Sequence, residues 1–169
     1  MKTLLLLRHA KAGGGVPGGS DHDRALTPRG HRAAELVALY LSQRPAPPSL
    51  ALCSSARRTL ETLEPLRRHL DLSVATLREL YLADPDALLE QIAQVEDREA
   101  SVVVIAHNPG LHELALLLAA GGDAAARARL REGFPTAALA VLELEIDTWA
   151  AIRPGCGRLV ELRLPRDLV

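Results

Sequence analysis

Apolar residues in this chain gather in short uninterrupted runs, and between those runs they recur at the spacing of a helix. The first run, Leu4–Leu7, leads directly into Arg8 and His9, with three glycines close behind at 13–15. By periodicity alone, four leucines fit a helix as well as a strand. Because the run is short and glycines follow it at once, it predicts a strand buried on both faces.

A second uninterrupted run, Ser101–Ala106, is the clearest strand in the sequence, and it leads into His107. Weaker runs predict further strands over residues 50–53, 71–77, 136–146 and 158–164. The run over 158–164 alternates between apolar and polar residues, which places it nearer to an edge of the sheet.

Helices are predicted where apolar residues share one face. Thr27 and Pro28 mark the start of a helix that ends near Gln43, because threonine is a good N-cap and proline is favoured at the first helical position. Another helix should follow a Ser54-Ser55 cap, with Pro65 bending or shortening it. Two more are predicted after Asp84-Pro85 and from residues 107–110 to about 120. Residues 12–23 are predicted to form a mobile loop, and residues 121–135 a loop with a helical turn.

Strands that alternate with helices along the chain indicate an α/β fold. The expected architecture has three layers, with a mostly parallel central sheet and helices on both faces. At 169 residues the chain is long enough for one sizeable core. No repeat or linker divides it, so residues 1–169 are predicted to be a single domain.

Composition narrows the functions that this fold would serve. The formal net charge is −1 and aromatic residues make up 2% of the chain, so neither an overall basic field nor base-stacking side chains favour nucleic acid as a partner. No apolar run approaches the length needed to span a bilayer or to form a secretory signal, so no membrane partner is expected. Cys53 and Cys156 make neither a disulfide framework nor a zinc set, and a reducing cytoplasm is the expected location.

Basic side chains follow the predicted parallel strands at the points where those strands end. Arg8 and His9 follow the first strand, Arg57 and Arg58 lie in the first helical turn after residues 50–53, and His107 follows Ser101–Ala106. Because parallel strands share one carboxyl edge, we expect two histidines and two or three arginines to converge there. Helix amino termini nearby would add N–H groups and a favourable dipole. Such a site suits a dianionic phosphate, since a planar guanidinium holds two oxygens at once.

Histidine has a clear role at a phosphate site. A neutral imidazole is a good nucleophile toward phosphorus near neutral pH, and the phosphoramidate that it forms is labile to water. Arginines and a second histidine would neutralise charge on the transferring oxygens. The sequence shows no carboxylate cluster that would hold a metal ion, so neither a metal nor a cofactor is predicted.

Other motifs point elsewhere but do not fit. The segment after Cys53 misses the C-x-x-x-x-x-R spacing of cysteine phosphatases by one residue, so Cys53 is predicted to be a buried strand thiol. His112-Glu113 begins an H-E-x-x-H motif, but Leu116 stands at its last position. The glycines at 13–19 match neither nucleotide-binding glycine motif. Arg57 is predicted to be a solvated or rim residue, His22 an exposed loop residue near the mouth of the site, and the remaining histidines ordinary helix residues: His31, His69 and His112.

Four segments of the chain combine into one pattern: Leu7-Arg8-His9-Ala10, Asp23–Gly30, Ser54-x-x-x-Arg58-x-x-x-Thr62 and Ala106-His107-Asn108. In this order they resemble the motifs of the histidine phosphatase superfamily, whose fold is that of the phosphoglycerate mutases. The resemblance covers nearly the whole chain. The short chain, with no large cap insertion, is most similar to the SixA-type phosphohistidine phosphatases.

The resemblance implies a role for each matching residue. His9 would become phosphorylated, Arg8 and Arg58 would clamp the phosphoryl oxygens, and His107 would complete the pocket and stabilise the transition state. Two departures stand out. Ala10 replaces a glycine that the motif often has, which is tolerated if the backbone there is not left-handed. The proton donor is less well defined, and Glu79 is the nearest match to the glutamate that many relatives use.

We therefore predict a metal-independent phosphatase, a phosphoric monoester or phosphoramidate hydrolase that works through a phosphohistidine on His9. Its preferred partner would be a protein carrying phosphohistidine, an inference that rests on the resemblance and on the small chain. A phosphatase of a small phosphorylated metabolite is the alternative, and a non-catalytic module that binds phosphorylated ligands is a third.

Overall fold

The computed structural model describes residues 1–169, and a seven-stranded sheet forms its centre. The strands lie in the order β3-β2-β4-β1-β6-β7-β5, and β6 alone runs against the others. The predicted α/β class with a mostly parallel sheet is therefore confirmed. The strands are β1 (Lys2–Arg8), β2 (Leu50–Ser54), β3 (Ser73–Leu77), β4 (Ser101–Ala106), β5 (Ala119–Gly122), β6 (Leu139–Leu144) and β7 (Gly157–Arg163).

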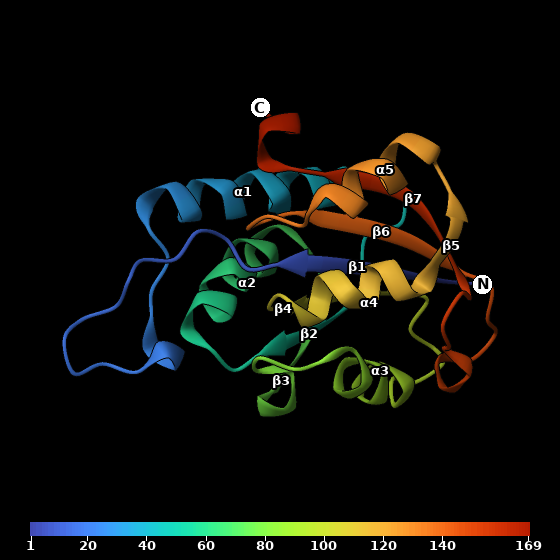
Figure 1. The fold of residues 1–169 in the computed structure, drawn as a ribbon, viewed down its shortest axis with the longest axis horizontal. Helices are drawn as coiled ribbons and strands as arrows, with labels where there is room; N and C mark the ends of the chain where they lie inside the picture. The colour runs from blue at the N-terminus through green and yellow to red at the C-terminus, as the bar shows by residue number, and fades with distance from the viewer.

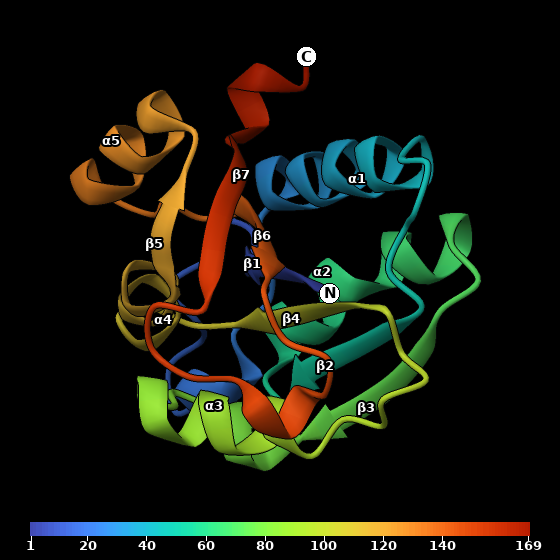
Figure 2. The same cartoon turned by 90° about the vertical axis from the view of Figure 1, so that its right-hand side faces the viewer.

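Helices cover both faces of the sheet and complete three layers, as Figure 2 shows. One face carries α1 (Pro28–Ser42) and α2 (Arg57–His69), and the other carries α3 (Pro85–Ala93), α4 (Gly110–Leu118) and α5 (Ala124–Glu132). Single 3₁₀ turns are η1 (Asp21–Asp23), η2 (Arg78–Leu80), η3 (Trp149–Ala151) and η4 (Pro165–Asp167). None of the helices combines the length and apolarity that crossing a bilayer requires.

The leucine run explains why β1 lies in the middle of the sheet. Successive strand residues point to opposite faces, so Leu4 and Leu6 pack into the core beneath α3, α4 and α5, while Leu5 and Leu7 pack beneath α1 and α2. All four side chains are fully buried. An uninterrupted apolar run is thus what a strand covered by helices on both faces requires.

Strand register brings the ends of three parallel strands to one edge. In β1 and β4, Leu7 pairs with Ile105 and Arg8 pairs with Ala106, and in β2 Cys53 pairs with Ile105. Figure 1 shows the segment between β1 and α1 extending beyond this same edge. Residues that directly follow these strands are therefore neighbours in space.

The segment from 119 to 132 differs from the prediction. It was expected to hold the end of a helix and then a loop with a helical turn, but it forms the edge strand β5 and the nine-residue helix α5. The Ala-Ala-Gly-Gly sequence of β5 has little strand propensity, and only its parallel pairing with β7 makes it a strand. Consequently β7, which we expected nearer to an edge, lies one strand inside it. The side chain of Asp123 caps α5 by accepting a hydrogen bond from the N–H of Ala126.

Two smaller differences concern α2 and β6. Helix α2 continues through Pro65 to His69, so the proline does not shorten it. The helix begins at Arg57 with Ala56 as N-cap residue, and Ser54 and Ser55 do not cap it. Strand β6 is shorter than the predicted span of 136–146, and Ala137, with a left-handed backbone conformation just before it, accounts for the later start.

Candidate functional site

Two histidines from different strands face each other at the shared sheet edge. His9 continues the alternation of Leu5 and Leu7 beyond β1, and His107 continues that of Val103 and Ile105 beyond β4. Both therefore lie on the side of the sheet that α1 and α2 cover. Their ring centroids are 5.3 Å apart, and the residues are 8% and 2% exposed.

The backbone next to His9 fixes the tautomer of its ring. Nδ1 lies 2.8 Å from the carbonyl oxygen of Ala10, which can only accept, so Nδ1 carries the proton. In the neutral ring Nε2 then keeps a free lone pair. The N–H of Ala10 donates to Thr62 Oγ1, which holds this peptide against α2. Ala10 is not among the residues with positive φ, so alanine is accommodated where the motif often has glycine.

Two arginines flank the histidines from opposite faces of the sheet. Arg58 lies in the first turn of α2, and its side chain is 4% exposed. Arg8 is the last residue of β1, and its Nη1 donates to the carbonyl oxygen of Phe134 at 3.2 Å. The same carbonyl accepts from Nδ2 of Asn108 at 2.7 Å. Arg8 Nε is buried and has no partner within the protein.

Burial and positive charge keep both histidines neutral. Burial lowers the pKa of His9 to about 4, with the charges of Arg58, Arg8 and Arg24 acting in the same direction. Burial and the charge of Arg58 lower the pKa of His107 to about 3. At neutral pH the dominant form of His9 is therefore the neutral ring, whose Nε2 is unprotonated, as a nucleophile requires.

Ser54 has a different partner from the one predicted. Its hydroxyl lies 2.7 Å from Nε2 of His107 and does not cap α2. The other ring nitrogen, Nδ1, is buried and unpartnered within the protein. Since buried polar groups are nearly always satisfied, this nitrogen and Arg8 Nε are candidates for contact with a ligand.

Sequence reasoning missed two residues, Asp21 and Tyr81, that lie beside Arg58. Nη2 of Arg58 donates to the carboxylate of Asp21 at 3.0 Å, and Nη1 donates to its backbone carbonyl at 2.8 Å. The Tyr81 hydroxyl and Arg24 donate to the same carboxylate. The hydrogen bonds from Tyr81, Arg24 and Arg58 hold the pKa of Asp21 well below its usual range. No local pattern marked Asp21 or Tyr81, because they reach Arg58 from loops far away in sequence.

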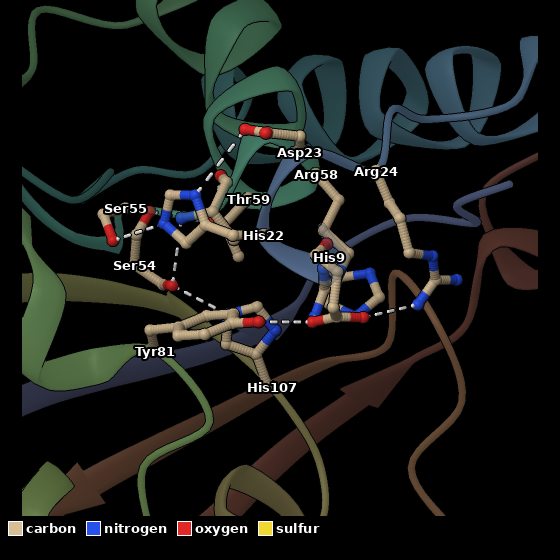
Figure 3. A network of polar contacts seen from close by, with 12 residues as sticks. His9, His22, Asp23, Arg24, Ser54, Ser55, Arg58, Thr59, Tyr81 and His107 are labelled. Carbon is tan, nitrogen blue, oxygen red and sulfur yellow. Dashed lines mark hydrogen bonds and ion pairs between the residues drawn. The ribbon is translucent and has the colours of Figure 1, made fainter. Parts of the chain in front are cut away.

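An open depression, the mouth, lies beside the site. It has a volume of about 380 Å³ and is lined by His22, Ser55, Arg78 and Tyr81. Figure 3 shows the Tyr81 ring lying next to His107, and their ring centroids are 5.5 Å apart. Nε2 of His22 lies 2.9 Å from Oγ of Ser55, and both residues line this depression.

A close backbone approach holds the segment after Tyr81 against the start of α4, just after His107. A Cβ at Gly110 would lie 1.8 Å from the carbonyl oxygen of Ala83, so any larger residue would force the two segments apart. The spacing between the mouth and the second histidine therefore depends on this glycine.

The structure thus brings together Arg8, His9, Arg58 and His107, and it leaves Glu79 apart. Glu79 lies on η2, is exposed and makes no hydrogen bond or ion pair, so its role as proton donor stays a prediction. Arg57 is confirmed as a solvated residue, with a side chain 57% exposed and paired with Glu61. Cys53 is confirmed as a buried strand thiol, whose pKa burial raises to about 12.

Arg8, His9, Arg58 and His107 form a cationic cup, and the remaining histidines lie outside it. His31 is exposed on α1, His69 pairs with Glu35, and His112 bonds to the carbonyl of Leu130. Nowhere do three or more His, Cys, Asp or Glu side chains gather closely enough to hold a metal ion.

The two buried histidines should make the fold sensitive to acid. The unfolded chain binds a proton at each near pH 6.5, whereas the native pKa values are about 4 and 3. The free energy of unfolding should thus fall as pH drops from about 6.5 toward 4, with each histidine contributing up to about 1.4 kcal/mol per pH unit. Urea denaturation across this range measures the slope. His107→Gln should reduce it and His31→Gln should not; an unchanged slope in His107→Gln would refute this account.

The α/β fold and this cationic cup define a class of enzymes that act on phosphorylated substrates. The sequence profile of the histidine phosphatase superfamily (branch 1) matches residues 4–81. A protein of Mycobacterium tuberculosis whose function is uncharacterized is 38% identical over 163 residues, covering 95% of this chain and 100% of that protein. Thus the chain belongs to the histidine phosphatase superfamily, and it is a phosphatase.

Solved structures place it closer to one group within that family. A Nakamurella multipartitia protein assigned as the phosphohistidine phosphatase SixA has a TM-score of 0.86 and 30% identity, with 97% of this chain and 96% of that chain covered. A protein histidine phosphatase SixA, solved with tungstate, has a TM-score of 0.77 and 25% identity over 99% of each chain. The chain is therefore SixA-like, with no large insertion.

Proposed function

We propose that this phosphatase works through a phosphohistidine on His9, needs no metal ion, and acts on phosphohistidine in proteins. The observation that carries the proposal is the state of the His9 ring. Nδ1–H is committed to the carbonyl of Ala10, Nε2 is unprotonated, and Arg58, Arg8 and His107 surround the ring. A nucleophile and the cations that a phosphoryl group needs thus converge in one cup.

The first chemical step transfers the phosphoryl group to the enzyme. The Nε2 lone pair of His9 forms a bond to phosphorus, and the bond from phosphorus to the substrate nitrogen breaks. That nitrogen leaves with the electron pair and takes up a proton. Arg58 and Arg8 neutralise charge on the phosphoryl oxygens, where electrostatic stabilisation contributes most of the catalysis.

The second step releases phosphate. Water attacks phosphorus, the bond to Nε2 breaks, and its electron pair returns to the ring. Orthophosphate leaves with the oxygen of that water. We assign His107 a contact with a phosphoryl oxygen in both steps, with the Ser54 hydroxyl donating to Nε2 and Nδ1 carrying the proton that it donates. The lack of a protein partner for the buried Nδ1 supports this role.

Two features favour a protein substrate carrying phosphohistidine. The mouth is an open depression and no inserted cap covers it, so a protein surface has access. In addition, Glu79 makes no hydrogen bond to the residues around His9, so this carboxyl is not held in position as a proton donor. This suits a phosphohistidine substrate, because a departing imidazole needs less help from a protein acid than an alkoxide does. Of the solved SixA proteins that this chain resembles, one is assigned as a phosphohistidine phosphatase and another is a protein histidine phosphatase.

A substrate panel tests the proposal. We would measure kcat/KM on a histidine-phosphorylated protein, on free phosphohistidine and on several sugar and aryl phosphates, each with and without EDTA. We expect the phosphoprotein to be preferred by at least about 100-fold, or about 2.7 kcal/mol of transition-state stabilisation, and EDTA to have no effect. A preference for sugar phosphates would overturn the assigned substrate class and favour a metabolite phosphatase. Strong inhibition by EDTA would overturn the metal-free mechanism.

A further inference from the structure

The guanidinium that the proposed mechanism assigns to substrate already holds an anion of the protein itself. One oxygen of the Asp21 carboxylate accepts from Arg58 Nη2 at 3.0 Å and from the Tyr81 hydroxyl, and the other accepts from Arg24 Nη1 at 3.0 Å. Figure 3 shows Tyr81 and Arg24 approaching this place from opposite sides. Three donors converging on one carboxylate form a ready-made anion cradle.

A phosphoryl group at His9 and the Asp21 carboxylate at Arg58 compete for the same donors. Two terminal N–H groups of Arg58 are already donated to Asp21, one to its carboxylate and one to its backbone carbonyl. A phosphoryl dianion placed in the cup would also repel a carboxylate at close range. The negative charge of Asp21 reaches the site, because it opposes the lowering of the pKa of His107.

The chain around Asp21 is built so that this carboxylate can leave. The preceding segment contains five glycines, and Gly15 and Gly18 adopt φ of +80°, a conformation that glycine adopts readily. The Asp21 side chain is 45% exposed, whereas that of Arg58 is 4% exposed. The base of the loop is fixed by the bridge between Ala12 and Leu26, so movement at Asp21 need not disturb the core.

We propose that Asp21 is an internal competitor, a resident carboxylate that substrate must displace from Arg58, Arg24 and Tyr81 before its phosphoryl group can bind. This inference rests on the proposed function for the identity of the substrate. Its test measures only anion binding and does not depend on that function. Because only molecules with a free cradle can bind, the apparent affinity for every anion is lowered by the same factor, which equals the fraction of molecules in which the cradle is free. Anions that bind weakly are thereby excluded from the site.

Binding of two matched ligands that the enzyme cannot hydrolyse tests this competition. Methylphosphonate and methanesulfonate share a shape, but at about pH 8.5 the first is a dianion and the second a monoanion, while His9 and His107 are neutral. Titration calorimetry would compare the wild type with Asp21→Asn and Asp21→Ala. Asp23→Asn is the control, because Asp23 lies on the same turn, its side chain is 77% exposed, and it does not contact Arg58.

We expect both Asp21 variants to bind each ligand at least about tenfold more tightly, by the same factor for the two ligands. The Asp23→Asn protein should change by less than about twofold. If the loss of one negative charge acted only through space, the gain for the dianion would be about the square of that for the monoanion, and this result would overturn the proposal. So would weaker binding in the Asp21 variants, which a role in orienting Arg58 predicts. Because no turnover is measured, the outcome is independent of whether His9 is the nucleophile.

Discussion

Replacing His9 with alanine is expected to lower kcat/KM by at least about 10⁴-fold on every phosphorylated substrate, because the variant has no group to accept the phosphoryl unit. The loss should appear in kcat more than in KM, since Arg58 and Arg8 still bind phosphate. Steady-state kinetics on an aryl phosphate and on a phosphohistidine protein measures both parameters.

A rapid-quench experiment adds a direct test of the intermediate. The wild type mixed with ³²P-labelled substrate should yield a phosphoenzyme that is stable in base and labile in acid, as a phosphoramidate is, and His9→Ala should yield none. His31→Ala is the matched control, since His31 is exposed on α1 and lies outside the cup; it should retain activity within about twofold. Turnover by His9→Ala at a rate near that of the wild type would refute the nucleophilic role.

Much of this site could be anticipated from the sequence, because its geometry follows from strands. A run that is apolar without interruption has to be covered on both faces, so β1 and β4 belong in the middle of the sheet. Once the two strands are parallel neighbours in register, the histidines that follow them must lie close together. The convergence of His9 and His107 is thus a consequence of two local patterns and one topological rule.

What could not be anticipated depends on contacts between distant segments. Strand β5 consists of alanine and glycine, and nothing in its own sequence distinguishes it from a loop; its pairing with β7 makes it a strand. Asp21 meets Arg58 across 37 positions and Tyr81 across 60 positions, and a loop aspartate carries no periodic signal. The cup's cations were predictable, whereas the anion that they hold was not.

Arg58 should be the residue whose replacement comes closest in effect to that of His9. Its side chain is 4% exposed and its guanidinium lies beside both histidines, lowering the pKa of each. Arg58→Ala is expected to lower kcat/KM by about 10²- to 10³-fold, the typical cost of removing one preorganised charge from a transition state. Arg57→Ala is the matched control, because Arg57 is the adjacent residue and its side chain is 57% exposed; it should change activity by less than about twofold.

Arg58→Lys separates charge from geometry. Lysine restores the positive charge but presents a point charge, without the planar fork that holds two phosphoryl oxygens at once. We therefore expect most of the activity loss to persist in Arg58→Lys, while Arg58→Ala alone raises the pKa of both His9 and His107, which NMR titration of the ring C–H signals would follow. Full activity in Arg58→Lys would show that charge alone suffices at this position. An unchanged pKa of His107 in Arg58→Ala would show that burial, without the guanidinium, keeps this ring neutral. The activity of Arg58→Lys and the histidine pKa values in Arg58→Ala together decide whether Arg58 contributes positive charge, a directional contact with the phosphoryl oxygens, or both. The convergence of Arg58, Arg24 and Tyr81 on the Asp21 carboxylate favours both contributions.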